Sequence, residues 1–246
     1  FKNVSLTYSG SGASSVEGIN FKAMKGQTIG VIGGTGSGKS SLVNLIPRLY
    51  DATQGEVLVD GVNVKDYDIE ALRNKVGIVM QKAVLFKGTI RENMWMGKKG
   101  ATDEQIDEAL EISQSKEFVD SKQGRLDYVI EQGGKNLSGG QRQRLTIARA
   151  IVRKPDVLIL DDSASALDFA TDAALRKAIR GMNNSPTVFI VSQRAASLMY
   201  ADLIIVLDDG QVAGMGTHDE LLANCEVYKE IYESQFKKAD SEGGVA

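Results

Sequence analysis

The chain has 246 residues, of which 42% are hydrophobic and 25% are charged, as is ordinary for a globular protein of one or two domains. Its 29 basic and 32 acidic residues give a net charge of −3, so no overall basic field argues for nucleic-acid binding. No apolar run approaches the roughly 18 residues that a membrane-spanning helix needs, and the single cysteine, Cys225, excludes an internal disulfide.

The first residues alternate as strands do. Val4, Leu6 and Tyr8 lie on one face of an expected strand, and a second strand is expected to begin at Ile19. The chain starts with Phe1 inside the first strand rather than with Met, and it has no signal peptide. We therefore expect it to be a piece of a longer polypeptide.

Residues 33–40 read Gly-Gly-Thr-Gly-Ser-Gly-Lys-Ser and fit G-x-x-x-x-G-K-[ST], the phosphate-binding P-loop. The apolar residues 28–32 predict a short buried strand before it. Leu42 and Leu45 after it have helical spacing, and Pro47 limits the helix. The motif thus stands in the strand–loop–helix context that it requires. A glycine-rich turn without a ligand, the alternative, accounts for fewer of these features.

The residue types of this loop suit a nucleotide. Glycines allow the backbone to curl and direct successive N–H groups inward, and the following helix N-terminus adds a partial positive charge. We expect Lys39 to reach the terminal phosphates and Ser40 to place its hydroxyl on Mg²⁺. The sequence therefore predicts a nucleotide site.

Strand patterns continue after the P-loop helix. Residues 57–62 predict a β-hairpin that turns at Asp60 and Gly61. The apolar run 76–80 predicts another strand, which ends at Gln81. We expect a mostly antiparallel section around the strand that precedes the P-loop.

Residues 82–155 are expected to be helical. Thr102 and Gln105 form a capping box in front of one helix. Residues 141–152 predict another, which Pro155 ends. Later strands are expected at residues 157–160, 187–191 and 203–207, with a helix after the first of them and one last helix from Thr217 to Phe236.

Asp161 and Asp162 follow the continuous apolar run 157–160, which is typical of a strand buried on both faces. Ligand chemistry in α/β folds lies at the carboxyl ends of such strands. Asp161 is therefore expected to hold Mg²⁺, directly or through water, opposite Ser40. The alternative is an aspartate that caps the next turn.

A second anion-binding pattern lies at residues 137–141, Leu-Ser-Gly-Gly-Gln, directly before the helix expected at 141–152. Because the chain already has its own phosphate loop, such a surface would face a different phosphate. A helix-capping serine is the alternative for Ser138 alone.

The P-loop, the apolar strand that ends in Asp161 and the Leu-Ser-Gly-Gly-Gln segment together resemble the nucleotide-binding domain of ABC transporters, over essentially the whole chain. Residues 46–51, 79–93 and 216–222 resemble the exporter branch of this family. The resemblance implies an α/β fold with a P-loop NTPase (RecA-like) core at 1–81 and 156–238. It also implies an N-terminal antiparallel β subdomain, an α-helical insertion subdomain at 82–155 and a flexible tail at 239–246.

The resemblance implies roles by position, with ATP and Mg²⁺ as ligands. Tyr8 would stack on adenine, unless it is a core-facing strand tyrosine, and Gln81 would sense Mg²⁺ and face the membrane domains. The nucleotide-binding set is Tyr8, Gly33, Gly34, Thr35, Gly36, Ser37, Gly38, Lys39, Ser40, Ser41, Ser138, Gly139, Gly140 and Gln141. The metal set is Ser40, Gln81 and Asp161, and the catalytic set is Lys39, Gln81, Asp162 and Gln193.

Other segments would make contacts with partners. Residues 138–141 would close over ATP held by the P-loop of a second nucleotide-binding domain, and residues 165–168, Ser-Ala-Leu-Asp, resemble the loop that crosses this head-to-tail dimer. Glu131 fits the exporter segment that contacts membrane domains, although Ile130 stands where a glycine is usual.

Two residues depart from the family pattern. Asp162 stands where a glutamate usually polarises the attacking water, and its side chain is one methylene, roughly 1.5 Å, shorter. Gln193 stands where a histidine normally touches the γ-phosphate, and an amide cannot relay a proton. The only histidine, His218, lies elsewhere in the sequence. Together the departures predict ATP binding with slow hydrolysis.

This pattern resembles the degenerate half of heterodimeric bacterial exporters. It implies a non-identical second nucleotide-binding domain with the glutamate and histidine, transmembrane domains in the same polypeptide, no nucleic-acid partner, and a place at the cytoplasmic face of the cell membrane. The alternatives are a regulatory ATP-binding module with negligible hydrolysis, a cytosolic ABC ATPase not linked to transport, and an importer subunit. A basic face or a coiled-coil insertion would favour the cytosolic ATPase, and exporter-like segments disfavour the importer.

Overall fold

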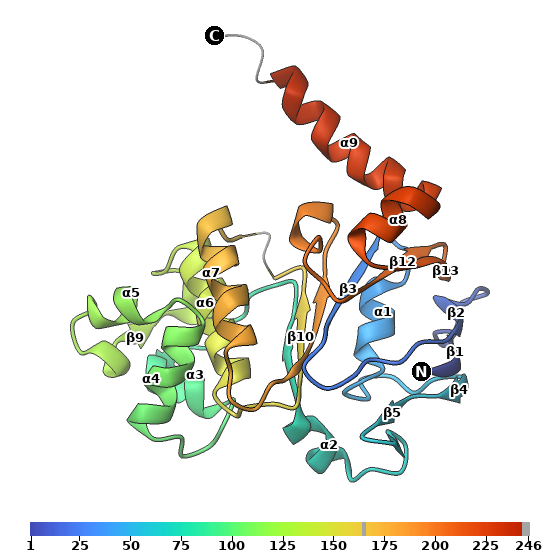
Figure 1. Ribbon diagram of the computed structural model, residues 1–246. Helices are drawn as coiled ribbons and strands as arrows, with labels where there is room; N and C mark the ends of the chain where they lie inside the picture. Colours follow the sequence, from blue (N-terminus) through green and yellow to red (C-terminus); the bar gives the residue numbers. More distant parts are fainter. Residues whose placement is uncertain (164–165, 243–246) are drawn as a thin grey trace. The chain divides into compact units, whose positions relative to one another are not determined.

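The computed structural model (Figure 1) describes residues 1–163 and 166–242. The chain forms two compact units. Unit 1 consists of Phe1–Arg73 with Thr187–Ala246, and unit 2 of Asn74–Pro186. The unit boundary at residue 73 falls inside helix α2 (Ile69–Lys75). Each unit is described by itself.

The main sheet of unit 1 is formed by β3 (Thr28–Gly33), β11 (Thr187–Val191), β12 (Leu203–Asp208) and β13 (Gln211–Gly216), in the order β13-β12-β3-β11. β3 runs parallel to both β11 and β12, and β13 returns antiparallel to β12. All residues of β3 and β11 are buried. Their continuous apolar sequences reflect burial on both faces, which confirms both predicted strands.

A second, antiparallel sheet of unit 1 has the order β2-β1-β4, formed by β1 (Lys2–Leu6), β2 (Val16–Ile19) and β4 (Gln54–Glu56). The prediction of a strand beginning at Ile19 was wrong, because β2 ends there. Val16 and Ile19 are its buried ends, and the pattern between them is interrupted by Gly18, whose φ of 61° places it in the left-handed region. Alternation therefore gave no signal for this strand.

The predicted hairpin is confirmed by β5 (Leu58–Val59) and β6 (Val62–Asn63), which pair antiparallel. Asp60 and Gly61 both have positive φ, 51° and 79°, as a tight hairpin turn of two residues requires.

Helix α1 (Lys39–Asn44), the 3₁₀ turn η3 (Ala195–Ser197), α8 (His218–Asn224) and α9 (Glu226–Glu242) complete unit 1. The prediction of one last helix was wrong, because Cys225 between α8 and α9 is extended, with φ −125° and ψ 104°. Cys225 is buried, and its Sγ donates to the carbonyl oxygen of Ala213 at 3.8 Å, so packing against β13 breaks the helix. Residues 243–246 of the predicted tail lie outside the described residues.

Unit 2 pairs β7 (Val76–Val79) with β10 (Val157–Asp161) in parallel. Its helices are α3 (Ile90–Trp95), α4 (Asp103–Ile112), α5 (Lys116–Asp120), α6 (Gly139–Ile151) and α7 (Phe169–Arg180), with 3₁₀ turns η1 (Arg125–Asp127) and η2 (Gln132–Gly134). Helix α6 packs on β7, where a Cβ on Gly77 would lie 2.9 Å from the Ala150 carbonyl oxygen. The capping box at Thr102 is confirmed.

A short antiparallel pairing of β8 (Gly88–Thr89) with β9 (Val129–Ile130) was not predicted. Helices α3 to α6 all lie within the range 82–155 that was expected to be helical, while the domain boundaries themselves stay a prediction. Across residues 1–163 and 166–242, no helix has both the length and the apolarity to cross a bilayer.

Candidate functional site

The predicted site residues divide between the two units. Unit 1 contains Tyr8, the P-loop and Gln193, whereas unit 2 contains Gln81, Asp161, Asp162 and residues 138–141.

The P-loop connects β3 to α1 and is packed tightly against its own chain. A Cβ on Gly33 would lie 2.1 Å from the Leu207 carbonyl oxygen of β12. Gly38, which precedes the first residue of α1, has φ 93°, and a Cβ there would lie 2.2 Å from the Ser15 carbonyl oxygen. These two glycines are therefore required by the packing of the loop itself.

Lys39 lies across this loop. Its Nζ donates to the carbonyl oxygens of Gly33 and Gly34, at 2.9 and 2.5 Å, and to Ser37 Oγ at 3.3 Å. The hydroxyl-bearing Ser40 is exposed at the start of α1. A fixed ammonium beside a curled backbone suits an anion with several oxygens, such as the phosphates of a nucleotide.

Tyr8 lies next to the first turn of α1. Its hydroxyl donates to Ser41 Oγ at 3.0 Å, and its ring meets that of Tyr50 edge-on, with centroids 4.9 Å apart. The ring is half-buried, so Tyr8 neither lies wholly in the core nor stands free. The structure thus brings Tyr8 to the P-loop helix, and its adenine-stacking role stays a prediction.

In unit 2 the structure brings Gln81 and Asp162 together. Asp161 ends β10 and is 4% exposed, and Asp162 follows it with φ 46° in the left-handed region. Gln81 Nε2 donates to Asp162 Oδ2 at 3.1 Å. Aspartate is one of the few residues that adopt this backbone conformation readily. The two residues are 81 positions apart, and their contact had no sequence signal beyond the resemblance.

Residues 138–141 begin α6 with a complete capping box. Ser138 Oγ accepts from the Gln141 N–H at 3.2 Å, and Gln141 Oε1 accepts from the Ser138 N–H at 3.1 Å. Ser138 is thus the helix cap that the alternative interpretation expected. The glycines have no such internal reason: a Cβ on Gly139 would meet Arg142 Nη2 at 3.9 Å, and one on Gly140 the Ala166 carbonyl oxygen at 3.4 Å, both ordinary contacts.

Arg149 ties α6 to the segment after Gln81. Its Nη2 donates to the Val84 carbonyl oxygen at 2.9 Å, and its guanidinium lies 5.9 Å from the centre of the Phe86 ring. Burial lowers the pKa of this guanidinium from its ordinary value. Sequence reasoning missed Arg149 because a helix periodicity does not reveal which loop a long side chain reaches.

Gln193 follows β11 with an exposed side chain. Its backbone carbonyl oxygen accepts from Gln235 Nε2 of α9 at 2.7 Å, and the Ala195 N–H donates to Gln235 Oε1 at 2.9 Å. His218 lies within 2.8 Å of the Tyr228 hydroxyl, where it joins α8 to α9. Sequence reasoning missed Gln235 because the contact spans 42 residues.

The segments predicted to meet partners are placed in part. Ser165 lies outside the described residues, whereas Asp168 caps α7 by accepting from the Thr171 N–H at 2.9 Å. Hydrogen bonds from Thr171 hold the pKa of the Asp168 carboxyl below its usual range. Ile130 is fully buried in β9 opposite Gly88, and the neighbouring Glu131 N–H donates to Asn136 Oδ1 at 3.0 Å.

Within the two described ranges, no cluster of three or more His, Cys, Asp or Glu side chains could hold a metal ion by itself. The Ser40 hydroxyl of unit 1, and the side-chain oxygens of Gln81 and Asp161 of unit 2, are each of the oxygen type that Mg²⁺ takes, and their joint role stays a prediction.

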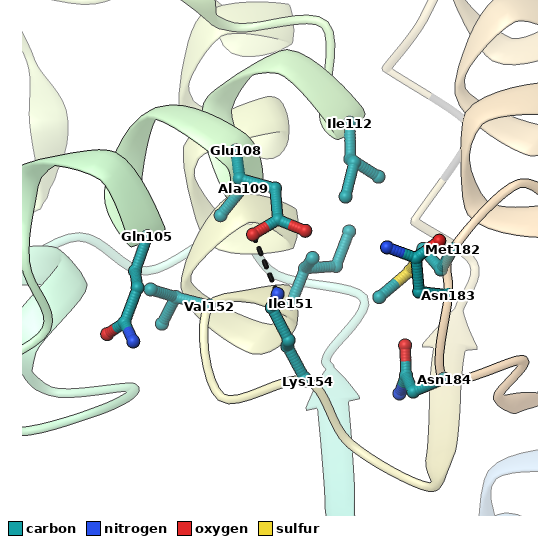
Figure 2. A pocket seen from close by; sticks show the side chains of 10 residues that line it. All are labelled: Gln105, Glu108, Ala109, Ile112, Ile151, Val152, Lys154, Met182, Asn183 and Asn184. Atoms are coloured by element: carbon teal, nitrogen blue, oxygen red, sulfur yellow. Dashed lines mark ion pairs between the residues drawn. The ribbon is translucent and has the colours of Figure 1, made fainter.

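A separate hollow lies in unit 2, beside α4 and the end of α6 (Figure 2). Glu108 and Lys154 at its edge are ion-paired with each other at 2.8 Å. None of the predicted site residues lines it. It is therefore not part of the predicted nucleotide site.

The fold and the P-loop define a mixed α/β nucleotide-binding domain. The chain belongs to the ABC transporter family. The model of this family matches residues 16–165, which is more than half of the chain. Members of this family bind nucleotide and are generally ATPases.

Relatives and a solved structure extend the likeness beyond these residues. The chain is 43% identical over 242 residues to the uncharacterized ABC transporter ATP-binding protein YfiB of Bacillus subtilis, covering 98% of this chain and 42% of that protein. It is 39% identical over 233 residues to a putative multidrug export ATP-binding/permease protein of Staphylococcus aureus, covering 95% and 40%. It is similar to a bacterial Atm1-family ABC exporter with ATP bound, with TM-score 0.90 and 32% identity over 96% of this chain and 41% of that one.

The predicted α/β fold and the exporter-type resemblance are confirmed by these matches. The chain spans about two fifths of the length of the relatives that it matches.

Proposed function

We propose that this chain is the ATP-binding and ATP-hydrolysing domain of an ABC exporter. In this proposal it dimerises head-to-tail with a second nucleotide-binding domain and drives export through transmembrane domains of the same polypeptide, at the cytoplasmic face of the cell membrane. The likeness to a multidrug export ATP-binding/permease protein and to an ATP-bound exporter supports it.

The observation that carries the proposal is the contrast between the two glycine-containing helix starts. Gly33 and Gly38 are needed by the packing of the P-loop, whereas a Cβ on Gly139 or Gly140 would make only ordinary contacts within this chain. Because the packing of this chain does not require glycine at positions 139 and 140, we infer that the small residues allow another molecule to approach closely. The nucleotide on a second domain is the occupant that we propose for this surface.

The P-loop residues 33–41 and Tyr8 would bind ATP, with the Lys39 ammonium on the terminal phosphates and the Tyr8 ring against adenine. Ser40 and Asp161, with Gln81, would hold Mg²⁺, which when bound supplies positive charge to the phosphate oxygens. The Asp162 carboxylate would accept a proton from the attacking water, and Gln193 would donate a hydrogen bond to the γ-phosphate.

The same residues support slow hydrolysis at the chain's own site. The Asp162 carboxylate already accepts from Gln81 at 3.1 Å, and it is one methylene shorter than glutamate. A misplacement of about 1 Å can cost on the order of a hundredfold in rate. In the proposal, ATP is retained at this site, while residues 138–141 complete a faster site on a partner that carries the glutamate and the histidine.

ATP turnover tests the proposal in three forms of the chain: unmodified, Asp162→Glu/Gln193→His, and Lys39→Ala. We expect slow turnover in the first and a rise on the order of a hundredfold in the second. The third should lose ATP affinity, measured by titration with a fluorescent nucleotide. Full turnover by the unmodified chain alone would refute the slow site and leave an ordinary symmetrical ATPase.

A regulatory ATP-binding module with negligible hydrolysis is the second candidate, favoured by Asp162 and Gln193. Mixing the chain with a partner domain that has the glutamate and histidine discriminates between the two. A rise in the partner's turnover supports participation in hydrolysis, and no change supports the regulatory module.

A further inference from the structure

The side-chain amide of Gln235 spans the loop after β11. Its Nε2 donates to the Gln193 carbonyl oxygen at 2.7 Å, and its Oε1 accepts from the Ala195 N–H at 2.9 Å. Both hydrogen-bonding ends of one side chain are thus used on two backbone groups that flank Arg194. A single amide that makes both bonds fixes the orientation of the peptide units on each side.

The start of this loop is held independently. Ser192 is buried, its N–H donates to the Val31 carbonyl oxygen at 3.1 Å, and its Oγ accepts from the Arg194 N–H at 2.9 Å. Residue 193 therefore lies between a fixed strand end and the Gln235 amide. Its backbone is held on both sides while its side chain is exposed.

Helix α9 is anchored on the face that carries Gln235. Tyr228 lies seven residues earlier, two helical turns, and so on the same face. Its side chain is fully buried, and its hydroxyl is hydrogen-bonded to His218 Nδ1 of α8 at 2.8 Å. α9 also packs against β12, β13 and η3. The packing of α9 therefore fixes the backbone from which the Gln235 side chain reaches the loop.

We propose that Gln235 is a positioning residue for residue 193. Its amide fixes the backbone of 193–195 and so sets the direction in which the side chain at 193 projects. This rests on the proposed function, in which residue 193 faces the γ-phosphate. The contribution acts through Gln193, and Gln235 itself does not touch ATP.

Amide hydrogen exchange and ATP turnover together test this role. Gln235→Ala should raise the exchange rate of the Ala195 amide about tenfold or more, because the side-chain oxygen that accepts its N–H is removed. In the Asp162→Glu/Gln193→His background, it should lower kcat three- to tenfold with little change in the KM for ATP. Gln235→Glu keeps the acceptor for Ala195 but loses the donor to Gln193, so Ala195 should stay protected while kcat still falls.

Ser234→Ala is the matched control. Ser234 is the preceding residue on α9, and its Oγ donates to the Ile231 carbonyl oxygen of its own helix at 2.9 Å. It should leave both the exchange of Ala195 and kcat unchanged. If Gln235→Ala behaves like Ser234→Ala, or lowers thermal stability without changing kcat, the positioning role is overturned. If the background enzyme does not hydrolyse ATP, the proposed function fails, and the exchange of Ala195 in Gln235→Ala then decides the role of Gln235 alone.

Discussion

The two glycine-containing helix starts of this chain differ in what holds them. At α1 the residue before the helix is Gly38, with a left-handed φ of 93°, and the surrounding backbone leaves no space for a Cβ. At α6 the corresponding residue is Ser138, extended at φ −66° and ψ 163°, and a reciprocal capping box satisfies the N–H groups of Ser138 and Gln141. The first start is shaped by its own chain, and the second is complete without help from glycine.

The difference teaches how to interpret a glycine in a motif. Where an added Cβ would collide with the backbone of the same chain, the fold itself requires glycine. Replacing such a glycine should lower the free energy of unfolding. A glycine that has open space around it and no positive φ lacks such a folding reason, so its replacement should matter only when a partner binds. Substitutions at the two helix starts should separate these two kinds of glycine.

Gly33→Ala should have the largest effect on folding. A Cβ would lie 2.1 Å from the Leu207 carbonyl oxygen, and both atoms belong to paired strands that cannot move apart cheaply. We expect a loss of roughly 3 kcal/mol or more in the free energy of unfolding, measured by urea denaturation. Gly34→Ala, where a Cβ meets nothing within 4 Å, is the control. An unchanged unfolding midpoint in Gly33→Ala would show that the loop is less tightly packed than described.

Gly139→Ala should reverse this result. Alanine is favoured over glycine in a helix by up to about 1 kcal/mol, so the unfolding free energy should stay level or rise. Turnover in the mixture with a hydrolysing partner domain should fall tenfold or more, because the added methyl group lies on the surface proposed to close over the partner's ATP. Undiminished turnover by the mixture would remove the external reason for this glycine.

Ser138→Ala tests the capping box. It removes the acceptor of the Gln141 N–H and should cost about 1 kcal/mol of unfolding free energy. Ser138→Thr retains the hydroxyl and should recover most of that loss. A neutral Ser138→Ala would mean that α6 is held by packing alone.

Low pH should weaken the stability that a carboxylate cap gives to a helix start, such as Asp168 at α7. It should not change the contribution of the α1 start, because Gly38 has no side chain that titrates. The hydrogen bonds of Thr171 lower the pKa of Asp168 in the folded chain, so the stability that they provide is present above the ordinary value of 3.8 and is lost as pH falls through the lower folded pKa. Asp168→Asn keeps a cap that does not titrate. Its unfolding free energy should therefore fall less steeply below pH 4 than that of the unmodified chain, a small difference measurable by chemical denaturation across pH.

Local patterns predicted well where the determining contacts are local. The capping box at Thr102 and the hairpin turn at Asp60 and Gly61 depend on neighbours within a few residues, and both are confirmed. The strand Thr187–Val191 pairs with the distant β3, but burial on both faces shows in its own apolar run, and it is confirmed as well. The break at Cys225 was missed because it depends on packing against β13. The same reason applies to the short pairing of β8 with β9, whose residues are about forty positions apart.

The candidate site follows the same rule. The P-loop could be predicted from spacing because its chemistry lies within eight consecutive residues. The roles of Gln81, Asp162 and Gln193 came from the resemblance, since no periodicity connects residues that far apart. The contacts of Arg149 with Val84 and of Gln235 with Gln193 had no signal at all, because long polar side chains reach loops that helix patterns do not identify.

The capping box of α6 bears on how the proposed dimer of nucleotide-binding domains would form and separate. Because Ser138 and Gln141 satisfy each other's N–H groups, this end of the helix needs no partner to be stable. Two such domains could therefore separate and meet again without either having to refold. In the proposed dimer, the rates of association and dissociation would then depend on the bound nucleotide rather than on folding of this helix start.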